Sequence, residues 1–445
     1  MQDWLKMTAG DLGRGIGRGE IDAEALCDTY LAAINAHPLR DRIYSVVTET
    51  RARAEAAAAA ARAKAGQRLG PLDGVPVSWK DLFDSAGVAT EAGSALLNGR
   101  VPGRDAEVLR NGTAAGLVCL GKTHMSELAF SGLGLNPVTA TPPCVNNADA
   151  VPGGSSSGAA ASVAFDLAAC GIGSDTGGSV RIPAAWNDLV GLKTTSGRVS
   201  LQGVVPLCLR FDTVGPLARS VEDAALMLAA LDGGKPADLR GVSLRGLRFA
   251  ALQTVVMDDL REAPEAGYAA ACARLRDAGV VIEEIEAPEV AEVMPLSPAL
   301  FSGEAYGLWR DVIEADPDKM FAPIRERFRG GKAISAADYV AGWHKLEGLR
   351  AAWHARVAGY DAVLMPTAPN LPPDHARLMQ DEDYYVTENL LTLRNTRVGN
   401  LMGLCAVTLP TGVASCGIML CGTPLQEERL LRVAKAVEDV LVSTN

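Results

Sequence analysis

Pro152–Gly158 has the sequence PGGSSSG, and Asp175–Arg181 has the sequence DTGGSVR. The glycines in these two segments allow backbone conformations that other residues avoid, and both segments contain serine. Farther upstream, Lys80 follows the hydrophobic stretch Gly74–Trp79. A lysine and serines in one site can form a hydrolytic nucleophile without histidine, because a neutral lysine can accept the proton of a serine hydroxyl.

Lys80 needs a particular environment to act as a base. Gly74–Trp79 is typical of a short, largely buried strand, so the amine at its end would leave bulk water. Burial disfavours the charged form and lowers the pKa of a lysine. The simpler alternative is a surface lysine whose stem packs on the protein while its ammonium stays in water. Only the presence of the two serine segments favours a buried, catalytic Lys80 over a surface lysine.

The serine segments also have simpler interpretations. Ser155–Ser157 precede Gly158–Ala164, a run of small residues typical of a helix, and serine is a preferred N-cap residue. Thr176–Ser179 has the composition of a tight turn. The functional alternative is that this loop directs several backbone N–H groups toward one point, as an oxyanion hole requires.

Together these segments resemble the core signature of the amidase signature family of serine hydrolases. The similarity continues through Arg181–Ala185 and Gly191–Thr194, and it resumes from Tyr360–Thr367 to the C-terminus. Residues 240–340 match only loosely. The resemblance implies an α/β fold in which a large, mixed, mostly parallel twisted sheet is flanked by helices.

The resemblance also implies roles for individual residues. Ser179 is the expected nucleophile, Ser155 the bridging serine on a cis peptide bond, and Lys80 the base that later helps to protonate the leaving amine. The oxyanion is expected to be held by four successive backbone N–H groups, those of Thr176, Gly177, Gly178 and Ser179. Three neighbours are expected to support the site: Ser156, Asp175 and Arg181. No cofactor is implied.

Composition limits the class of protein. The chain has 445 residues, 48% of them hydrophobic, and a formal net charge of −11. The acidic balance argues against nucleic acid as a partner, and neither a signal peptide nor a membrane-spanning stretch is evident. Nine scattered cysteines without a Cys-x-x-Cys pair indicate reduced thiols, and five histidines without a ligand motif indicate no metal site. We therefore expect a cytoplasmic monomer or homodimer that acts on a small molecule.

No Gly/Ser- or Pro-rich linker divides the chain, and the motif segments lie far apart. We therefore expect a single domain over residues 1–445, with residues 240–340 as a variable, largely helical elaboration. Because the expected strands alternate with helices, the sheet is expected to be largely parallel. The clearest helices are expected at 22–33, 48–65, 220–231 and 427–442, and the clearest strands at 117–120, 168–172, 247–251, 280–285, 362–365 and 407–409.

Two other motifs carry less weight. Gly116–Thr123 matches the letters of a phosphate-binding loop, but its middle residues are apolar and strand-like, so we interpret it as a core strand and turn. Gly154–Gly158 matches the Gly-x-Ser-x-Gly elbow of α/β-hydrolases, which would make Ser156 the nucleophile. The residues before this elbow are typical of a loop and not of the strand that an elbow needs. Its base would be one of three later histidines: His344, His354 or His375.

Three functions remain open at this point. The first is an amide hydrolase that forms an acyl-enzyme, with esters, carbamates and ureas as alternative substrates. The second is the glutaminase component of an amidotransferase in a tRNA-charging complex, whose relatives typically have glutamine where this chain has Ile182. The third is a binding module that keeps only the fold. No arginine can be assigned from the sequence to a substrate carboxylate.

Overall fold

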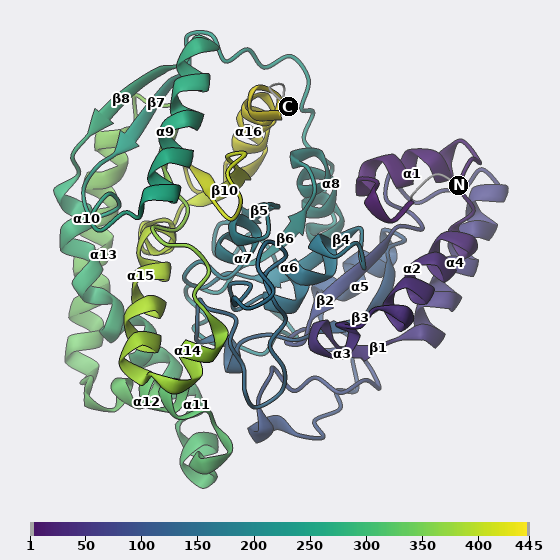
Figure 1. Cartoon of the computed structure of the whole chain (residues 1–445), viewed down its shortest axis with the longest axis horizontal. Coiled ribbons are helices and arrows are strands. Elements are labelled where there is room, and N and C mark those ends of the chain that lie inside the picture. The colour runs from purple at the N-terminus through teal and green to yellow at the C-terminus, as the bar shows by residue number, and fades with distance from the viewer. Residues whose placement is uncertain (1–3, 443–445) are drawn as a thin grey trace.

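One mixed sheet organises the computed structural model, which describes residues 4–442 (Figure 1). In this part of the chain, eleven strands pair in the order β1-β3-β2-β4-β6-β5-β10-β11-β9-β7-β8. Strands from the N-terminal and C-terminal parts of the chain thus share one sheet. Their bounds are β1 Tyr44–Val47, β2 Pro76–Lys80, β3 Val118–Thr123, β4 Cys170–Ser174, β5 Val190–Lys193, β6 Val214–Ala218, β7 Arg248–Leu252, β8 Val281–Ile285, β9 Ala362–Pro366, β10 Cys405–Pro410 and β11 Gly417–Gly422.

The α/β fold with a large mixed sheet is confirmed, but the sheet is not mostly parallel. Among the described pairings, β2 is parallel to β3 and β4, and β7 is parallel to β8 and β9. The other six pairings are antiparallel. The prediction assumed that a helix follows every strand. Instead, residues 411–416 join β10 directly to β11, and so short a connection allows only an antiparallel hairpin.

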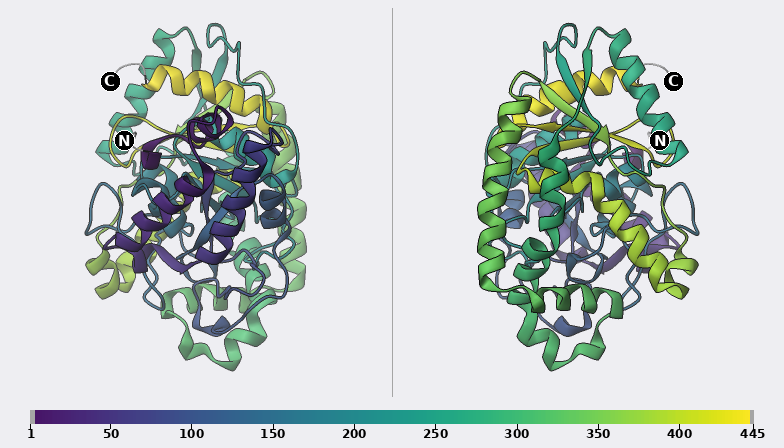
Figure 2. Two further views of the ribbon diagram at one scale, coloured as in Figure 1. Left: turned by 90° about the vertical axis from the view of Figure 1, so that its right-hand side faces the viewer. Right: turned by 90° about the vertical axis from the view of Figure 1, so that its left-hand side faces the viewer.

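Helices flank the sheet on both sides. Figure 2 shows α2 and α4 on one side of the molecule and α13 and α15 on the opposite side. The bounds of the helices are α1 Ala9–Gly17, α2 Ala23–Ala36, α3 Arg40–Ile43, α4 Glu49–Lys64, α5 Glu107–Ala114, α6 Ser157–Ala164, α7 Arg181–Trp186, α8 Val221–Asp232, α9 Glu262–Asp277, α10 Pro288–Val293, α11 Gly303–Ala315, α12 Ala322–Arg329, α13 Ala336–Val357, α14 His375–Gln380, α15 Glu382–Leu401 and α16 Glu427–Val442.

The expected elements begin where local chemistry predicts. Asp22 caps α2 by accepting the N–H groups of Glu24 and Ala25, and Ser220 caps α8 by accepting that of Asp223. The alanine-rich helix α4 and the amphipathic C-terminal helix α16 are confirmed within a few residues of their predicted bounds. The predicted strands correspond to β3, β4, β7, β8, β9 and β10.

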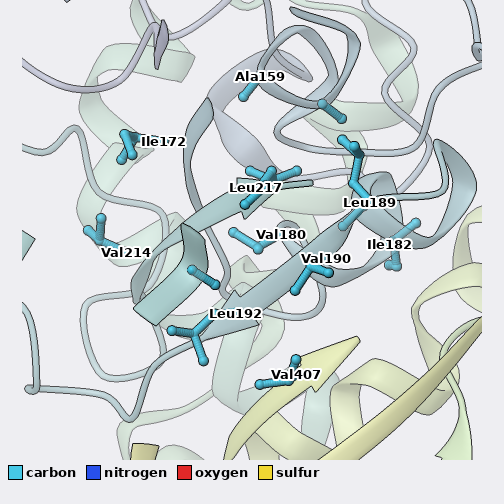
Figure 3. Packing of buried hydrophobic residues seen from close by; sticks show 14 of the residues in the cluster. Ala159, Ile172, Val180, Ile182, Leu189, Val190, Leu192, Val214, Leu217 and Val407 are labelled. Carbon is cyan, nitrogen blue, oxygen red and sulfur yellow. The ribbon is translucent and has the colours of Figure 1, made fainter. Parts of the chain in front are cut away.

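The core beneath the serine segments is built from β4, β5, β6, β10 and the helices that cover them. Figure 3 shows Ile172 of β4, Leu217 of β6 and Leu192 of β5 among these side chains. Each is fully buried. Because these strands are fixed by a close-packed interior, the loops that follow them are held on a rigid base.

All nine cysteines lie within the described residues, and each is buried and free of a disulfide. This agrees with the expectation of reduced thiols. No helix between residues 4 and 442 is both long enough and apolar enough to cross a membrane.

Candidate active site

Lys80 ends β2 and Ser174 ends β4, and these two strands are parallel neighbours. Parallel neighbours bring their carboxyl ends to the same edge of a sheet, so the two side chains meet there. Lys80 Nζ donates hydrogen bonds to Ser155 Oγ at 2.7 Å and to Ser174 Oγ at 2.8 Å. The lysine is fully buried, so the alternative of a surface lysine is wrong.

Burial lowers the pKa of Lys80 to about 7, although the negative charges of Asp175 and Asp212 act in the opposite direction. Both hydrogen-bond partners of the amine are neutral hydroxyls, and no carboxylate in residues 4–442 pairs with it. A substantial fraction of this lysine is therefore neutral near pH 7. A neutral amine has the lone pair that a general base requires.

The serine run lies in the turn that leads into α6. The peptide bond between Gly154 and Ser155 is cis. Ser156 occupies the N-cap position of α6 but makes no capping hydrogen bond with its side chain. Its hydroxyl instead donates to the carbonyl of Ser174 at 3.2 Å and accepts the N–H of Ser174 at 3.3 Å. Since Ser156 is buried and occupied in this way, neither the capping interpretation nor the nucleophile elbow is supported for it.

Ser179 ends the loop that follows β4 and lines a narrow cavity. Its Oγ forms no hydrogen bond with any part of residues 4–442, and its carbonyl accepts the N–H of Ser156 at 3.2 Å. The structure therefore joins Lys80 to Ser155 by a hydrogen bond but does not join Ser155 to Ser179. Catalytic hydrogen bonds are often long without substrate and shorten in the Michaelis complex.

Three of the four expected oxyanion donors are unoccupied. No acceptor within the described residues takes the backbone N–H of Thr176, Gly177 or Ser179, and all three residues line the cavity. The N–H of Gly178 differs, because it donates to Asp175 Oδ1 at 2.9 Å. Gly178 has φ +139°, and a Cβ there would lie 2.1 Å from Thr396 Oγ1, so only glycine fits this position.

Asp175 and Arg181 fix the loop without lining the cavity. Arg181 donates from Nε and Nη2 to the Asp175 carboxylate, each at 2.9 Å, and Asn400 Nδ2 donates to the same group at 2.9 Å. Burial would raise the pKa of Asp175, but the Arg181 guanidinium and these hydrogen bonds hold it well below its usual range. The carboxylate is therefore a fixed anchor for the loop backbone.

Other contacts fix the remaining residues of this loop. Thr176 Oγ1 donates to Asp212 Oδ1, and the same carboxylate accepts the N–H groups of Leu207 and Cys208. Thr396 Oγ1 donates to the carbonyl of Gly177 at 2.8 Å. The loop is thus held from both sides before any substrate arrives, which is the preorganisation that electrostatic catalysis requires.

The phosphate-loop motif has no role at this site. Its residues 118–123 form the buried strand β3, as interpreted from the sequence. Lys122 Nζ donates to Asp81 Oδ1 at 3.0 Å and to Thr90 Oγ1 at 2.8 Å, so it is not available for phosphate. Within residues 4–442, no group of three or more His, Cys, Asp or Glu side chains is arranged to hold a metal ion.

Sequence reasoning missed several residues of the site. Ser174 was not singled out, and neither was any residue of α15. Leu393 and Arg397 are one helical turn apart on α15, a spacing that places them on one face, but the sequence does not say what this face meets. The cavity is lined by Ala129, Phe130, Ser131, Thr176, Gly177, Ser179, Leu207, Phe301, Arg327, Leu393 and Arg397.

A family model described as Amidase matches residues 25–431. The chain belongs to the Amidase family. This member is 35% identical to 2-amino-5-chloromuconic acid deaminase of Comamonas testosteroni, over 95% of this chain and 94% of that protein. It is 32% identical to a glutamyl-tRNA(Gln) amidotransferase subunit of Sinorhizobium medicae, over 98% of each chain.

The fold of this Amidase family member is similar to that of peptide amidase from Stenotrophomonas maltophilia. The TM-score is 0.80 and the sequence identity 28%, over 98% of this chain and 96% of that one. The resemblance stated from the sequence is thus confirmed at the level of the family. Membership supports hydrolysis of a carbon–nitrogen bond as the class of reaction.

Proposed function

We propose that this protein hydrolyses the C–N bond of a small carboxylic amide through an acyl-enzyme on Ser179. The observation that carries the proposal is the buried amine of Lys80, which lies 2.7 Å from Ser155 Oγ. Ser179 is held close to this pair, because its carbonyl accepts the N–H of Ser156, the residue next to Ser155. With its pKa near 7, this amine can accept a proton under ordinary conditions. No histidine is required for the reaction.

In the proposed mechanism, Ser179 Oγ attacks the amide carbon. Its proton passes to Ser155 Oγ while the proton of Ser155 passes to Lys80 Nζ. The oxyanion is bound by backbone N–H groups of the loop, those of Thr176, Gly177 and Ser179. The lysine then returns its proton through Ser155 to the leaving nitrogen, the C–N bond breaks, and an ester to Ser179 remains. Water hydrolyses this ester by the same proton path in reverse.

Ser174 and Ser156 position this relay without reacting. The Ser174 hydroxyl accepts a hydrogen bond from Lys80 Nζ and so helps to fix the amine at the end of β2. Ser156 joins the carboxyl end of β4 to the turn that contains Ser155. Buried hydrogen bonds of this kind restrict the rotation of Lys80 and of the turn that contains Ser155.

The alternative is the glutaminase step of an amidotransferase. Its support is the match to an amidotransferase subunit over 98% of both chains. The same serines and lysine would serve that reaction, because glutamine is itself a carboxylic amide. Glutamine therefore belongs in the substrate test.

The acidic composition and the free buried thiols favour a cytoplasmic setting without a nucleic-acid partner.

The test is a screen of linear amides, glutamine, esters and carbamates, with the released amine or alcohol as the readout. On the best amide, Ser179→Ala and Lys80→Met are each expected to lower kcat/KM by about a thousandfold or more. Ser196→Ala, which removes an exposed hydroxyl that does not line the cavity, is the control and should retain activity.

A fluorophosphonate probe provides a second readout that does not depend on the choice of substrate. It is expected to label Ser179 in the wild-type protein, and Lys80→Met should slow the labelling. Wild-type turnover by Ser179→Ala, or a label found on Ser156, would contradict the mechanism.

A further inference from the structure

Two arginines line the cavity together with Ser179. Arg397 comes from α15, and Arg327 comes from α12, the helix Ala322–Arg329. No Asp or Glu is among the lining residues in the described part of the chain. The chain contains 53 acidic residues, yet none of them lines the cavity next to these two guanidinium groups. The charge of the cavity lining is therefore positive, whereas the net charge of the chain is negative.

Arg327 is partly occupied by its surroundings. Its Nη1 donates to the carbonyl of Phe130 at 2.9 Å, and its guanidinium carbon lies 4.3 Å from the centre of the Phe130 ring. These contacts orient the group but do not neutralise its charge.

Arg397 has even fewer contacts. It forms no hydrogen bond, ion pair or ring contact with any residue between 4 and 442, although the cavity wall buries much of its side chain. Burial lowers the pKa of Arg397 to about 9, and the nearby positive charge of Arg327 acts in the same direction. By contrast, Arg181, which does not line the cavity, is paired with a carboxylate at 2.9 Å. A guanidinium that leaves water without a partner is unfavourable, unless a ligand supplies the partner.

We propose that Arg397 binds a carboxylate of the substrate, with the charge of Arg327 reinforcing it. A guanidinium presents paired N–H donors that match the two oxygens of a carboxylate. Much of the remaining cavity wall is apolar, formed by Phe130, Leu207, Phe301 and Leu393. Little free space remains inside this cavity, so it suits only a short substrate.

The substrate class that fits is the half-amide of a short dicarboxylic acid. Its amide lies at Ser179, its carbon chain against the apolar wall, and its free carboxylate at Arg397. The amide part of this assignment rests on the proposed function, whereas the carboxylate part rests only on the cavity and its two unneutralised arginines.

The test measures binding by titration calorimetry, with the dicarboxylates succinate, glutarate and adipate as probes and 1,5-pentanediol as the neutral probe. At least one dicarboxylate is expected to bind the wild-type protein, and the diol is not. Arg397→Gln should weaken that binding by about 10- to 100-fold, and Arg397→Lys should restore part of it.

Arg394→Gln is the matched control. Arg394 lies on the same helix, donates to the carbonyl of Val256 at 3.3 Å and does not line the cavity, so its loss should leave the binding unchanged. Failure of every dicarboxylate to bind wild type, or equal binding by wild type and Arg397→Gln, would overturn the proposal.

This readout separates the two proposals, because it needs no turnover. If Ser179 proves unreactive while dicarboxylates still bind through Arg397, the amide hydrolase is refuted and the carboxylate site stands. The opposite outcome is also possible, and it compares kcat/KM for glutaramate with kcat/KM for neutral valeramide. If amides are hydrolysed and this ratio is the same in Arg397→Gln as in wild type, the carboxylate site is refuted and the hydrolase stands.

Discussion

Lys80 is the residue whose environment most directly predicts a measurable property. Its amine is surrounded by protein, bonded to two serine hydroxyls and without a carboxylate partner in the described residues, so its positive charge is poorly stabilised. Burial accordingly lowers its pKa to about 7. Only the neutral form can accept a proton from Ser155, and the neutral fraction grows as the pH rises through this value.

We therefore expect kcat/KM to rise about tenfold per pH unit below pH 7 and to level off above it. The measurement is a pH–rate profile from about pH 5 to about pH 9, with protein stability followed over the same range to separate titration from unfolding. A profile that is flat across neutrality, with the protein folded throughout, would contradict the role of Lys80 as the base.

The sequence was sufficient to propose Lys80, Ser155 and Ser179 because their segments together resemble the amidase signature, although each segment alone has a simpler interpretation. It was not sufficient to find Ser174 or Arg397. Ser174 is a serine at the end of a strand, without a motif around it. It contacts Lys80 only because β2 and β4 pair. The sequence around Arg397 is that of an ordinary helix. Its position at the cavity depends on the packing of α15 against a loop more than 200 positions earlier in the chain. Such residues are defined by tertiary contacts and not by local pattern.

Helix α15 is the element that holds the cavity together. Asn389 Oδ1 accepts the N–H of Gly132 at 2.8 Å, Thr396 Oγ1 donates to the carbonyl of Gly177 at 2.8 Å, and Asn400 Nδ2 donates to Asp175 at 2.9 Å. The helix thus contacts the loop before α6 and the loop after β4. It also carries Leu393 and Arg397 of the cavity wall.

This arrangement makes Thr396→Val informative, since valine keeps the shape of threonine but removes the donor to Gly177. We expect kcat to fall about five- to tenfold with little change in KM, because the loop loses one restraint and no substrate contact. Leu390→Ala on the same helix, where the leucine is 50% exposed, is the control. Unchanged kcat in Thr396→Val would show that the bond from Thr396 to Gly177 does not contribute to the reactive geometry of the loop.

The same helix explains why part of the fold was hard to predict. Its buried face includes Glu388, Asn389, Asn395 and Asn400, whereas Leu390 on the opposite side is exposed. Periodicity methods assume that the buried face is apolar, and here it is largely polar because it bonds to loop backbone. Helices with apolar buried faces, such as α16, were predicted correctly.

At the scale of the whole molecule, we infer that residues 1–445 form one domain. In the described part of the chain, β7 from the middle of the sequence pairs with β9 from the C-terminal part, and α16 packs against both α8 and α9. The exposed connection at residues 233–247 joins α8 to β7. It overlaps the start of residues 240–340, the region expected to be a variable, largely helical elaboration, which also contributes β7 and β8 to the sheet.

A cut in this connection should leave the molecule intact. We expect a chain cleaved at a protease site inserted after Gly241 to elute as one species in size-exclusion chromatography, because the strand pairings and α16 still hold the two pieces. Uncleaved protein with the same insertion is the control. Separation into two folded pieces would indicate two domains.

The outer strand β8 has a further consequence for behaviour at high concentration. In the described chain it pairs only with β7, so one row of its backbone N–H and C=O groups is open to strands of other molecules. Two neighbouring positions on this strand are the acids Glu283 and Glu284. Glu283 is paired with Arg248 of β7, but Glu284 is exposed, and a charged side chain on an edge strand opposes pairing with a second copy. We therefore expect the charge of Glu284 to keep the outer edge of this long sheet from pairing with other molecules.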